Sequence, residues 1–443
     1  MDIDNVSPEG ELINDPTEGD PTPPPLFDPY RIAATPTMQN LVKKVSGYLL
    51  NVEQHQRLRT RARRPRDLEV FHKTMEALLS DLAYQSLIGH QSIRVTRSKD
   101  RLASASRYES DLMSKQLPYI LDVLTKQMGV LRMELGYNSP FGGKQTEISA
   151  SPWLMKRFAE NSIGLHDTDR REGEELILLK GTKFSLGRSA LAEYTDDALT
   201  DQYRAEVKLI NGYLRKADIC FDSDASSGLV VDDRNRYLRR IFTRGSFGTG
   251  GRLFGGFWQP LGKRERLAST TINGESVVSL DYKAMIASLA YASVHATPPT
   301  DDAYVTTFQA AKDSEPVTLQ RSTVKKLFAA AMFAESPLKQ WPDGLRAGGR
   351  GLPVSVVLAG IKQAHPALVP LMFKGLGHAL QFSESEILID ALLKLIDLDI
   401  PALPVHDCLV VPQSALEVTQ GVMENTFAFH TGATARIAAE YPE

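Results

Sequence analysis

The chain has few cysteines: only Cys220 and Cys408 occur among its 443 residues, far apart and without the spacing of metal ligands. This scarcity excludes a disulfide framework and a cysteine-based zinc site, and it predicts a reducing, cytoplasmic environment. The nine histidines are scattered, so they do not supply the His and Asp ligand set of a metal phosphohydrolase. No run of about 18 apolar residues is present, which predicts no membrane partner, and the first residues lack the pattern of a secretory signal.

Basic residues are missing from the first 30 positions, where the chain is acidic and rich in proline. Eight carboxylates fall there, and removing these eight negative charges from the net −3 leaves +5 on the rest of the chain. Such a segment has too little apolar surface to fold, so we predict a disordered tail over residues 1–30. As an alternative function, the tail could act as an acidic mimic that screens a basic cleft.

Apolar residues recur at helical spacing from Leu41 to Val52, and similar patterns follow. We predict a mainly helical region over residues 31–230. Six arginines lie within the ten residues from Arg57 to Arg66. They could grip a phosphate backbone or form a solvated connector, and the sequence leaves both interpretations open.

From residue 231 the composition changes, because basic residues, aromatic rings and glycines are interleaved. Between residues 234 and 266 nine cationic side chains face a single acid, Glu265. Cations bind phosphates, aromatic faces stack on bases, and glycines allow close approach of the backbone. A basic loop pinned by aromatic core residues is the alternative. We predict a nucleic-acid-binding segment, with Arg239, Arg240, Arg244 and Arg252 as the contact residues.

Two apolar, β-prone segments each carry one aspartate, Asp281 and Asp407. If neighbouring strands bring these carboxylates together, they can hold hard cations such as Mg²⁺, with Mn²⁺ as an alternative. The main-chain carbonyl of Tyr282 would be a further oxygen ligand. The second segment is predicted to be a tight β-hairpin with His406 and Asp407 at its tip. Taken singly, each aspartate is also compatible with a strand end that caps the next helix.

A helix is predicted between Pro316 and Pro337. Arg321 and Lys325 are four residues apart and therefore share one face, and Phe333 lies eight residues beyond Lys325. Two cations on one face can hold a triphosphate, and an aromatic ring two turns on can close over a nucleotide. The alternative is a cationic surface helix with Phe333 in the core.

In this order the three motifs resemble the single-subunit polymerase superfamily, which comprises family A DNA polymerases and the related phage and mitochondrial RNA polymerases. The resemblance extends over roughly residues 238–425. Asp281-Tyr282 is similar to motif A of that family, and His406-Asp407 is similar to motif C. The residues similar to the fingers helix of motif B are Arg321, Lys325 and Phe333.

The resemblance implies a role for each of these residues. Asp281 and Asp407 would bind two Mg²⁺ ions, and His406 would orient the end of the growing strand. Arg321 and Lys325 would bind the triphosphate, and Phe333 would lie beside the sugar and base. The residues expected to contact template or primer are Gln381 and Glu384, on a predicted helix before motif C.

The fold implied is an α+β right hand, with an antiparallel-sheet palm and small helical fingers over residues 231–443. The mainly helical region 31–230 would be a thumb or a template-binding module. The partners implied are a DNA template-primer and dNTPs, with NTPs as the alternative. The expected setting is the cytoplasm, in a bacterial, phage or plasmid context.

Three departures from the family pattern concern the choice of sugar. Ile286 stands where family A DNA polymerases usually have glutamate, Phe333 replaces the usual tyrosine, and Cys408 follows His-Asp in place of an acid or a serine. A bulky apolar Ile286 would leave a ribose 2′-hydroxyl without a hydrogen-bond partner, which favours dNTPs. The missing phenolic hydroxyl at Phe333 would relax that discrimination, so the sugar remains open.

DNA synthesis by a two-metal mechanism is therefore the first functional prediction. RNA synthesis or primase-like initiation by a member of the same superfamily is the close alternative. From a different class, a catalytically silent nucleic-acid-binding protein on a polymerase palm would rely on the basic segment alone.

Overall fold

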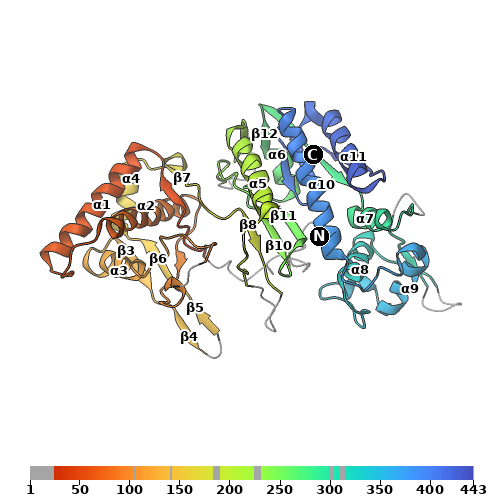
Figure 1. The fold of residues 1–443 in the computed structure, drawn as a ribbon, viewed down its shortest axis with the longest axis horizontal. Helices are drawn as coiled ribbons and strands as arrows, with labels where there is room; N and C mark the ends of the chain where they lie inside the picture. The colour runs from red at the N-terminus through yellow and green to blue at the C-terminus, as the bar shows by residue number, and fades with distance from the viewer. Residues whose placement is uncertain are drawn as a thin grey trace. The chain divides into compact units, whose positions relative to one another are not determined.

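The computed structural model describes residues 24–103, 106–139, 142–182, 190–223, 231–298, 303–309 and 315–442. These residues form two compact units, an N-terminal unit that ends at Glu175 and a C-terminal unit that begins at Leu176 (Figure 1). Each unit has an apolar core of its own. In the described part of the chain, no helix combines the length and apolarity needed to cross a membrane.

The N-terminal unit combines helices with short strands. Its α-helices are α1 (Pro36–His55), α2 (Pro65–Leu87), α3 (Leu117–Asp122) and α4 (Pro152–Glu160). A three-stranded antiparallel sheet has the order β2 (Ile93–Val95), β6 (Thr146–Ala150), β3 (Leu131–Glu134). Two further antiparallel pairs are β1 (Arg31–Ala33) with β7 (Thr168–Arg170) and β4 (Tyr137–Ser139) with β5 (Gly142–Lys144). The region predicted to be mainly helical therefore contains short antiparallel sheets as well as its helices.

The segment just before β1 corrects the predicted tail. Phe27 and Tyr30 are buried, and the Phe27 amide donates to the carbonyl of Arg94 at 2.8 Å. Two aromatic rings and a main-chain hydrogen bond bring residues 24–30 into the folded unit. A prediction based on acidic composition does not take these contacts into account. The rest of the predicted tail, residues 1–23, lies outside the described residues.

The C-terminal unit contains the longer helices. They are α5 (Ala198–Lys216), α6 (Lys263–Ser269), α7 (Met285–Ser293), α8 (Arg321–Phe333), α9 (Val354–Ala364), α10 (Gly377–Asp397) and α11 (Leu416–Thr431). The helix α10 packs against β11, α11, α7 and α5. The predicted helix between the two prolines is confirmed as α8, which begins at Arg321 and ends at Phe333.

Antiparallel strands form the main sheet of this unit. Its order is β16 (Leu403–Val405), β17 (Cys408–Pro412), β13 (Glu275–Tyr282), β12 (Thr270–Ile272), β9 (Ile219–Phe221), and β18 (Ile437–Glu440) also pairs with β13. A second sheet has the order β11 (Ser246–Phe254), β10 (Arg239–Thr243), β8 (Ile177–Leu179), and a short pair joins β14 (Thr307–Phe308) to β15 (Val317–Thr318). Helices and largely antiparallel sheets make the unit α+β, as predicted.

The predicted domain boundary at residue 231 differs from the observed division at Leu176. Strand β8 pairs with β10, and β9 pairs with β12, so residues before 231 complete both sheets of the C-terminal unit. The side chains of α5 join the same core through Val207, Ile210 and Leu214. Long-range strand pairing sets this boundary, and the local composition does not reveal it.

Candidate active site

Strand register brings the two predicted catalytic aspartates together. In the pairing of β13 with β17, Asp281 lies opposite Cys408. In the β16–β17 hairpin Val405 pairs with Cys408, which leaves His406 and Asp407 as a two-residue turn. His406 has a φ of 57°, a left-handed value common in such tight turns. Asp407 is therefore the chain neighbour of the residue opposite Asp281, at the same end of two paired strands.

The pKa of the Cys408 thiol is affected by the charges of both carboxylates. Burial raises the pKa of this thiol to about 12, and the negative charges of Asp281 and, less strongly, Asp407 act in the same direction. The Cys408 Sγ also lies 3.3 Å from the hydroxyl of Ser279. This half-buried thiol thus lies within electrostatic reach of both aspartates, in agreement with the strand register.

A pocket of about 440 Å³, its open mouth included, lies beside this hairpin. Five elements meet there: the hairpin, the start of α7, the middle of α8, the middle of α10 and strand β11. Its lining residues are Arg252, Met285, Ile286, Tyr304, Lys325, Phe328, Ala329, Glu384, His406 and Asp407. Six of the predicted site residues, distant in sequence, therefore meet around one cavity.

A buried ion pair forms one wall of the pocket. The guanidinium Nε of Arg252 donates to Oε1 of Glu384 at 2.6 Å, and the two side chains are 11% and 1% exposed. The second oxygen of Glu384, Oε2, has no hydrogen-bond partner. A buried carboxylate requires such a cation nearby, because desolvation otherwise costs several kcal/mol. Both residues were predicted from the sequence to contact nucleic acid, and in the structure they form an ion pair with each other.

Helix α8 presents only part of its predicted site to the pocket. Lys325 lines the cavity, and the guanidinium of Arg321 lies 4.9 Å from the ring centre of Tyr304, another lining residue. Phe333, at the far end of the helix, packs edge-on against His378 with ring centres 4.9 Å apart and does not line the cavity. The rows of an α-helix turn slowly, so a residue eight positions beyond Lys325 faces the start of α10 instead.

The prediction that Arg240 binds nucleic acid is wrong. Its side chain is 0% exposed, pairs with Glu386 and with Glu206, and donates to the carbonyl of Gly251 at 2.9 Å. Its guanidinium also lies 4.3 Å from the ring centre of Tyr203. Arg240 therefore joins β10 to α5 and α10 inside the core, where no phosphate can reach it.

Two of the other predicted contacts remain closer to solvent. Arg239 is half-buried, and the exposed Arg244 pairs with Glu335. Gln381 is 1% exposed and its Oε1 has no hydrogen-bond partner. A template or primer cannot reach the Gln381 side chain in this conformation, because this face of α10 is buried.

Three of the aromatic residues of the basic segment, Phe242, Phe257 and Trp258, are buried core residues, and Tyr237, Phe247 and Phe254 are half-buried. Trp258 is fully buried, and its indole N–H donates to the carbonyl of Pro404 at 2.9 Å. Gln259 donates to the same carbonyl at 3.1 Å. Pro404 belongs to β16, so this segment supports the hairpin that carries His406 and Asp407.

Tyr282 turns its side chain away from the pocket. Its ring is 2% exposed, and its hydroxyl donates to the carbonyl of Met423 on α11 at 2.8 Å. Alternation along β13 explains this, since successive side chains of a strand point to opposite faces. The predicted role of Tyr282 as a metal ligand thus rests on its main-chain carbonyl.

The donor set fits magnesium. Among the described residues, no group of three or more His, Cys, Asp and Glu side chains is arranged to hold a metal ion. Magnesium, however, is commonly held by one or two carboxylates together with substrate phosphates. Asp281 and Asp407 would supply two such hard oxygen ligands, and the raised pKa of the Cys408 thiol disfavours a thiolate ligand beside them.

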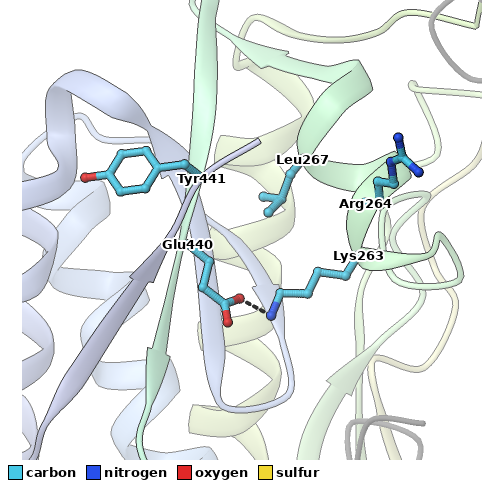
Figure 2. A pocket seen from close by; sticks show the side chains of 5 residues that line it. All are labelled: Lys263, Arg264, Leu267, Glu440 and Tyr441. Atoms are coloured by element: carbon cyan, nitrogen blue, oxygen red, sulfur yellow. Dashed lines mark ion pairs between the residues drawn. The ribbon is translucent and has the colours of Figure 1, made fainter. Parts of the chain in front are cut away.

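A second hollow lies on another part of the same unit. Lys263, Arg264 and Leu267 of α6 line it together with Glu440 and Tyr441 (Figure 2). The Lys263 ammonium and the Glu440 carboxylate point toward each other and form an ion pair, while Tyr441 points away. None of the predicted catalytic residues lines this hollow.

Several lining residues were not expected from the sequence. Phe328 and Ala329 follow Lys325 by three and four residues, so helical spacing would have placed them on the same face. Met285 begins α7, shortly after the strand that carries Asp281, so its place near the site could also have been predicted from the sequence. Tyr304 lies in a stretch without a recognisable motif, and no sequence signal marks it.

Comparisons with known proteins give little support to the polymerase resemblance. No protein-family model matches the chain, and no curated protein matches it. Among solved structures the chain is similar to the POL domain of Pol1 from M. smegmatis, determined with DNA primer-template and dNTP, at 10% identity and a TM-score of 0.25. The match covers 93% of this chain and 66% of that chain. A TM-score of this size carries no argument, so the site rests on its own geometry.

Proposed function

We propose that the C-terminal unit catalyses template-directed nucleotidyl transfer, and that DNA synthesis is its reaction. The observation that carries the proposal is the register of β13 and β17, which brings Asp281 next to Asp407 beside a pocket lined by Lys325. Aspartate carboxylates from neighbouring strands and a cation on a facing helix suit a triphosphate held by divalent metal ions.

The proposed site has an anionic and a cationic side; Asp407 lines the pocket, whereas Asp281 lies beside it in the strand register and is not a lining residue. Asp281 and Asp407 would hold two Mg²⁺ ions, which when bound would lower the pKa of an attacking 3′-hydroxyl and stabilise the charge that develops on the phosphates. Lys325 is half-buried and makes no ion pair with any described residue, so its charge is available to phosphate oxygens. Arg321 lies at the edge, where its guanidinium contacts Tyr304.

The apolar wall favours deoxyribonucleotides. Ile286 lines the pocket together with Met285 and Phe328. A ribose 2′-hydroxyl against such side chains loses its hydrogen bonds to water and gains none from the protein. We therefore place dNTPs first as substrates, and NTPs second.

Primer extension on a DNA template tests the proposal. With Mg²⁺ and dNTPs we expect extension by the unaltered protein, and a loss of about a thousandfold or more in Asp281→Asn and Asp407→Asn. Asp397→Asn, at an exposed position near the end of α10, is the matched control and should extend normally.

The alternatives give different outcomes in the same assay. Extension with NTPs alone would make the protein an RNA polymerase or a primase-like enzyme. A failure to incorporate either substrate, with DNA binding intact, would identify a silent binding protein. Full activity in both aspartate variants would rule out this site.

A further inference from the structure

The loop between α1 and α2 of the N-terminal unit is a strongly cationic surface that the proposed reaction does not use (Figure 1). From residue 54 to residue 66 the chain has six arginines and no acid. Five of these arginines are exposed, and none of the five makes an ion pair with a described residue. We call these five the basic loop, a name that here includes Arg66 in the first turn of α2: Arg57, Arg59, Arg61, Arg64 and Arg66.

The sixth arginine anchors this loop. Both terminal nitrogens of Arg63 donate to the Glu53 carboxylate, one of them at 2.6 Å, and the two side chains are 4% and 5% exposed. The Arg63 guanidinium also lies 4.2 Å from the ring centre of Phe71, which is fully buried. Arg63, near the end of the connecting segment, therefore contacts both flanking helices, Glu53 of α1 and Phe71 of α2.

Nearby acids do not neutralise the surface. Glu53 is already bound to Arg63, and Glu69, whose pKa is lowered chiefly by its hydrogen bond with Lys73, lies 2.7 Å from that lysine. Asp67 in the first turn of α2 is a single half-buried carboxylate against five exposed cations. Helix α2 begins at Pro65, between Arg64 and Arg66, and the positive end of its dipole adds to the charge of this surface.

We infer that the basic loop binds the phosphate backbone of nucleic acid, as a contact separate from the proposed active site. Guanidinium groups bind phosphates in a planar, two-pronged geometry, and the loop contains arginine without a single lysine. An anionic membrane is the weaker match, because Leu58 is the only large apolar side chain exposed in the loop. The arginines recognise the charge and spacing of the phosphates and not the bases, so we expect binding to be insensitive to base sequence.

Binding of the full-length protein to a fluorescent single-stranded DNA circle tests the inference. A circle offers no 3′ end, so it separates backbone binding from recognition of a primer terminus. We expect replacement of all five loop arginines by glutamine to weaken binding roughly tenfold or more near 0.1 M salt. The slope of log affinity against log salt should also become shallower by about 2–3.

Two matched variants make the result specific. Five exposed cations elsewhere on the same unit give a control with the same change of charge: Lys43, Lys44, Lys99, Arg101 and Arg132. Their replacement by glutamine should leave most of the affinity, and replacement of the five loop arginines by lysine should keep most of the salt slope. All changes are at exposed positions, and a shared thermal unfolding midpoint confirms that the variants fold.

Three results would overturn the inference. The first is an unchanged affinity when the loop arginines become glutamine, and the second is an equal loss in the control set, which would point to net charge alone. The third is a loop variant that keeps its DNA affinity but no longer binds vesicles containing phosphatidylserine, since the surface would then face lipid. Primer extension measured alongside tests the proposed function independently.

Discussion

Ile286 is the side chain whose chemistry most directly bears on substrate choice. It lines the pocket five residues after Asp281, where a carboxylate or amide would have offered a hydrogen-bond partner. We expect Ile286→Ala to lower the ratio of kcat/KM for dNTP over NTP by roughly tenfold, because the change removes bulk facing the sugar. Steady-state extension with each substrate measures the ratio. An unchanged ratio would mean that the sugar does not contact this wall.

Asp81 is a buried carboxyl in the N-terminal unit. Its carboxylate accepts the main-chain N–H of Asp28 at 2.9 Å and the side-chain amide of Gln85 at 3.2 Å. Burial, assisted by the negative charge of Asp28, raises the pKa of Asp81 to about 7, while Arg31 opposes the shift. The ionised form is therefore disfavoured in the folded state, and it becomes populated near neutral pH.

This carboxyl predicts a pH-dependent stability of the N-terminal unit. A raised pKa contributes stability at pH values below that of the unfolded carboxyl, about 4, and the contribution is lost as the pH rises to about 7. We expect Asp81→Asn, which keeps an oxygen for the Asp28 amide, to flatten the fall in the free energy of unfolding between pH 4 and pH 7, on the order of a few kcal/mol, as measured by urea titration at each pH. Equal slopes for both proteins would contradict this expectation.

At the scale of elements, the Arg252–Glu384 pair joins β11 to α10 at the pocket wall. Removing the cation alone leaves Glu384 buried without compensation. We expect Arg252→Met to lower the free energy of unfolding by about 3 kcal/mol, and the double change Arg252→Met with Glu384→Leu to recover much of that loss. Urea titration measures both values. A single variant as stable as the unaltered protein would show that the Glu384 carboxylate does not need this cation.

The elements of the site differ in how far the sequence predicts them. Helix α8 and the turn at His406-Asp407 follow from local patterns: helical spacing between two prolines, and two apolar runs around a polar pair. Arg240 was misassigned because an exposed arginine and a buried arginine have the same local signal. The partners that bury it, Glu206 and Glu386, come from distant helices. Trp258, within the segment predicted to bind nucleic acid, instead supports the hairpin, which agrees with the alternative of aromatic core residues.

At the scale of the whole molecule, each of the two units has its own main core among the described residues, with a smaller cluster around Phe242 also in the C-terminal unit, and this predicts two unfolding transitions. One core lies within residues 27–163 and the other within 176–427. In differential scanning calorimetry, Asp81→Asn should shift one transition and Arg252→Met the other, because each change affects one core. A single transition displaced by both variants would mean that the units unfold together.

The α+β class could be predicted from the sequence, but the division of the chain could not. Apolar periodicity identifies helices and strands one at a time, whereas the boundary depends on β8 and β9 crossing to pair with β10 and β12. The site shows the same limit. Its aspartates are visible as strand ends, and only the pairing of those strands shows that they adjoin.

The central claim is that Asp281 and Asp407 act as one catalytic unit, and a double-mutant cycle on Mg²⁺-dependent primer extension tests it most directly. Single-turnover rates are compared for the unaltered protein, Asp281→Asn, Asp407→Asn and the doubly substituted protein. We predict that each single change costs about a thousandfold or more and that the double change costs little beyond the worse single one, because residues that act as a unit are not additive. Losses that multiply, or a single variant that extends at the unaltered rate, would contradict the claim.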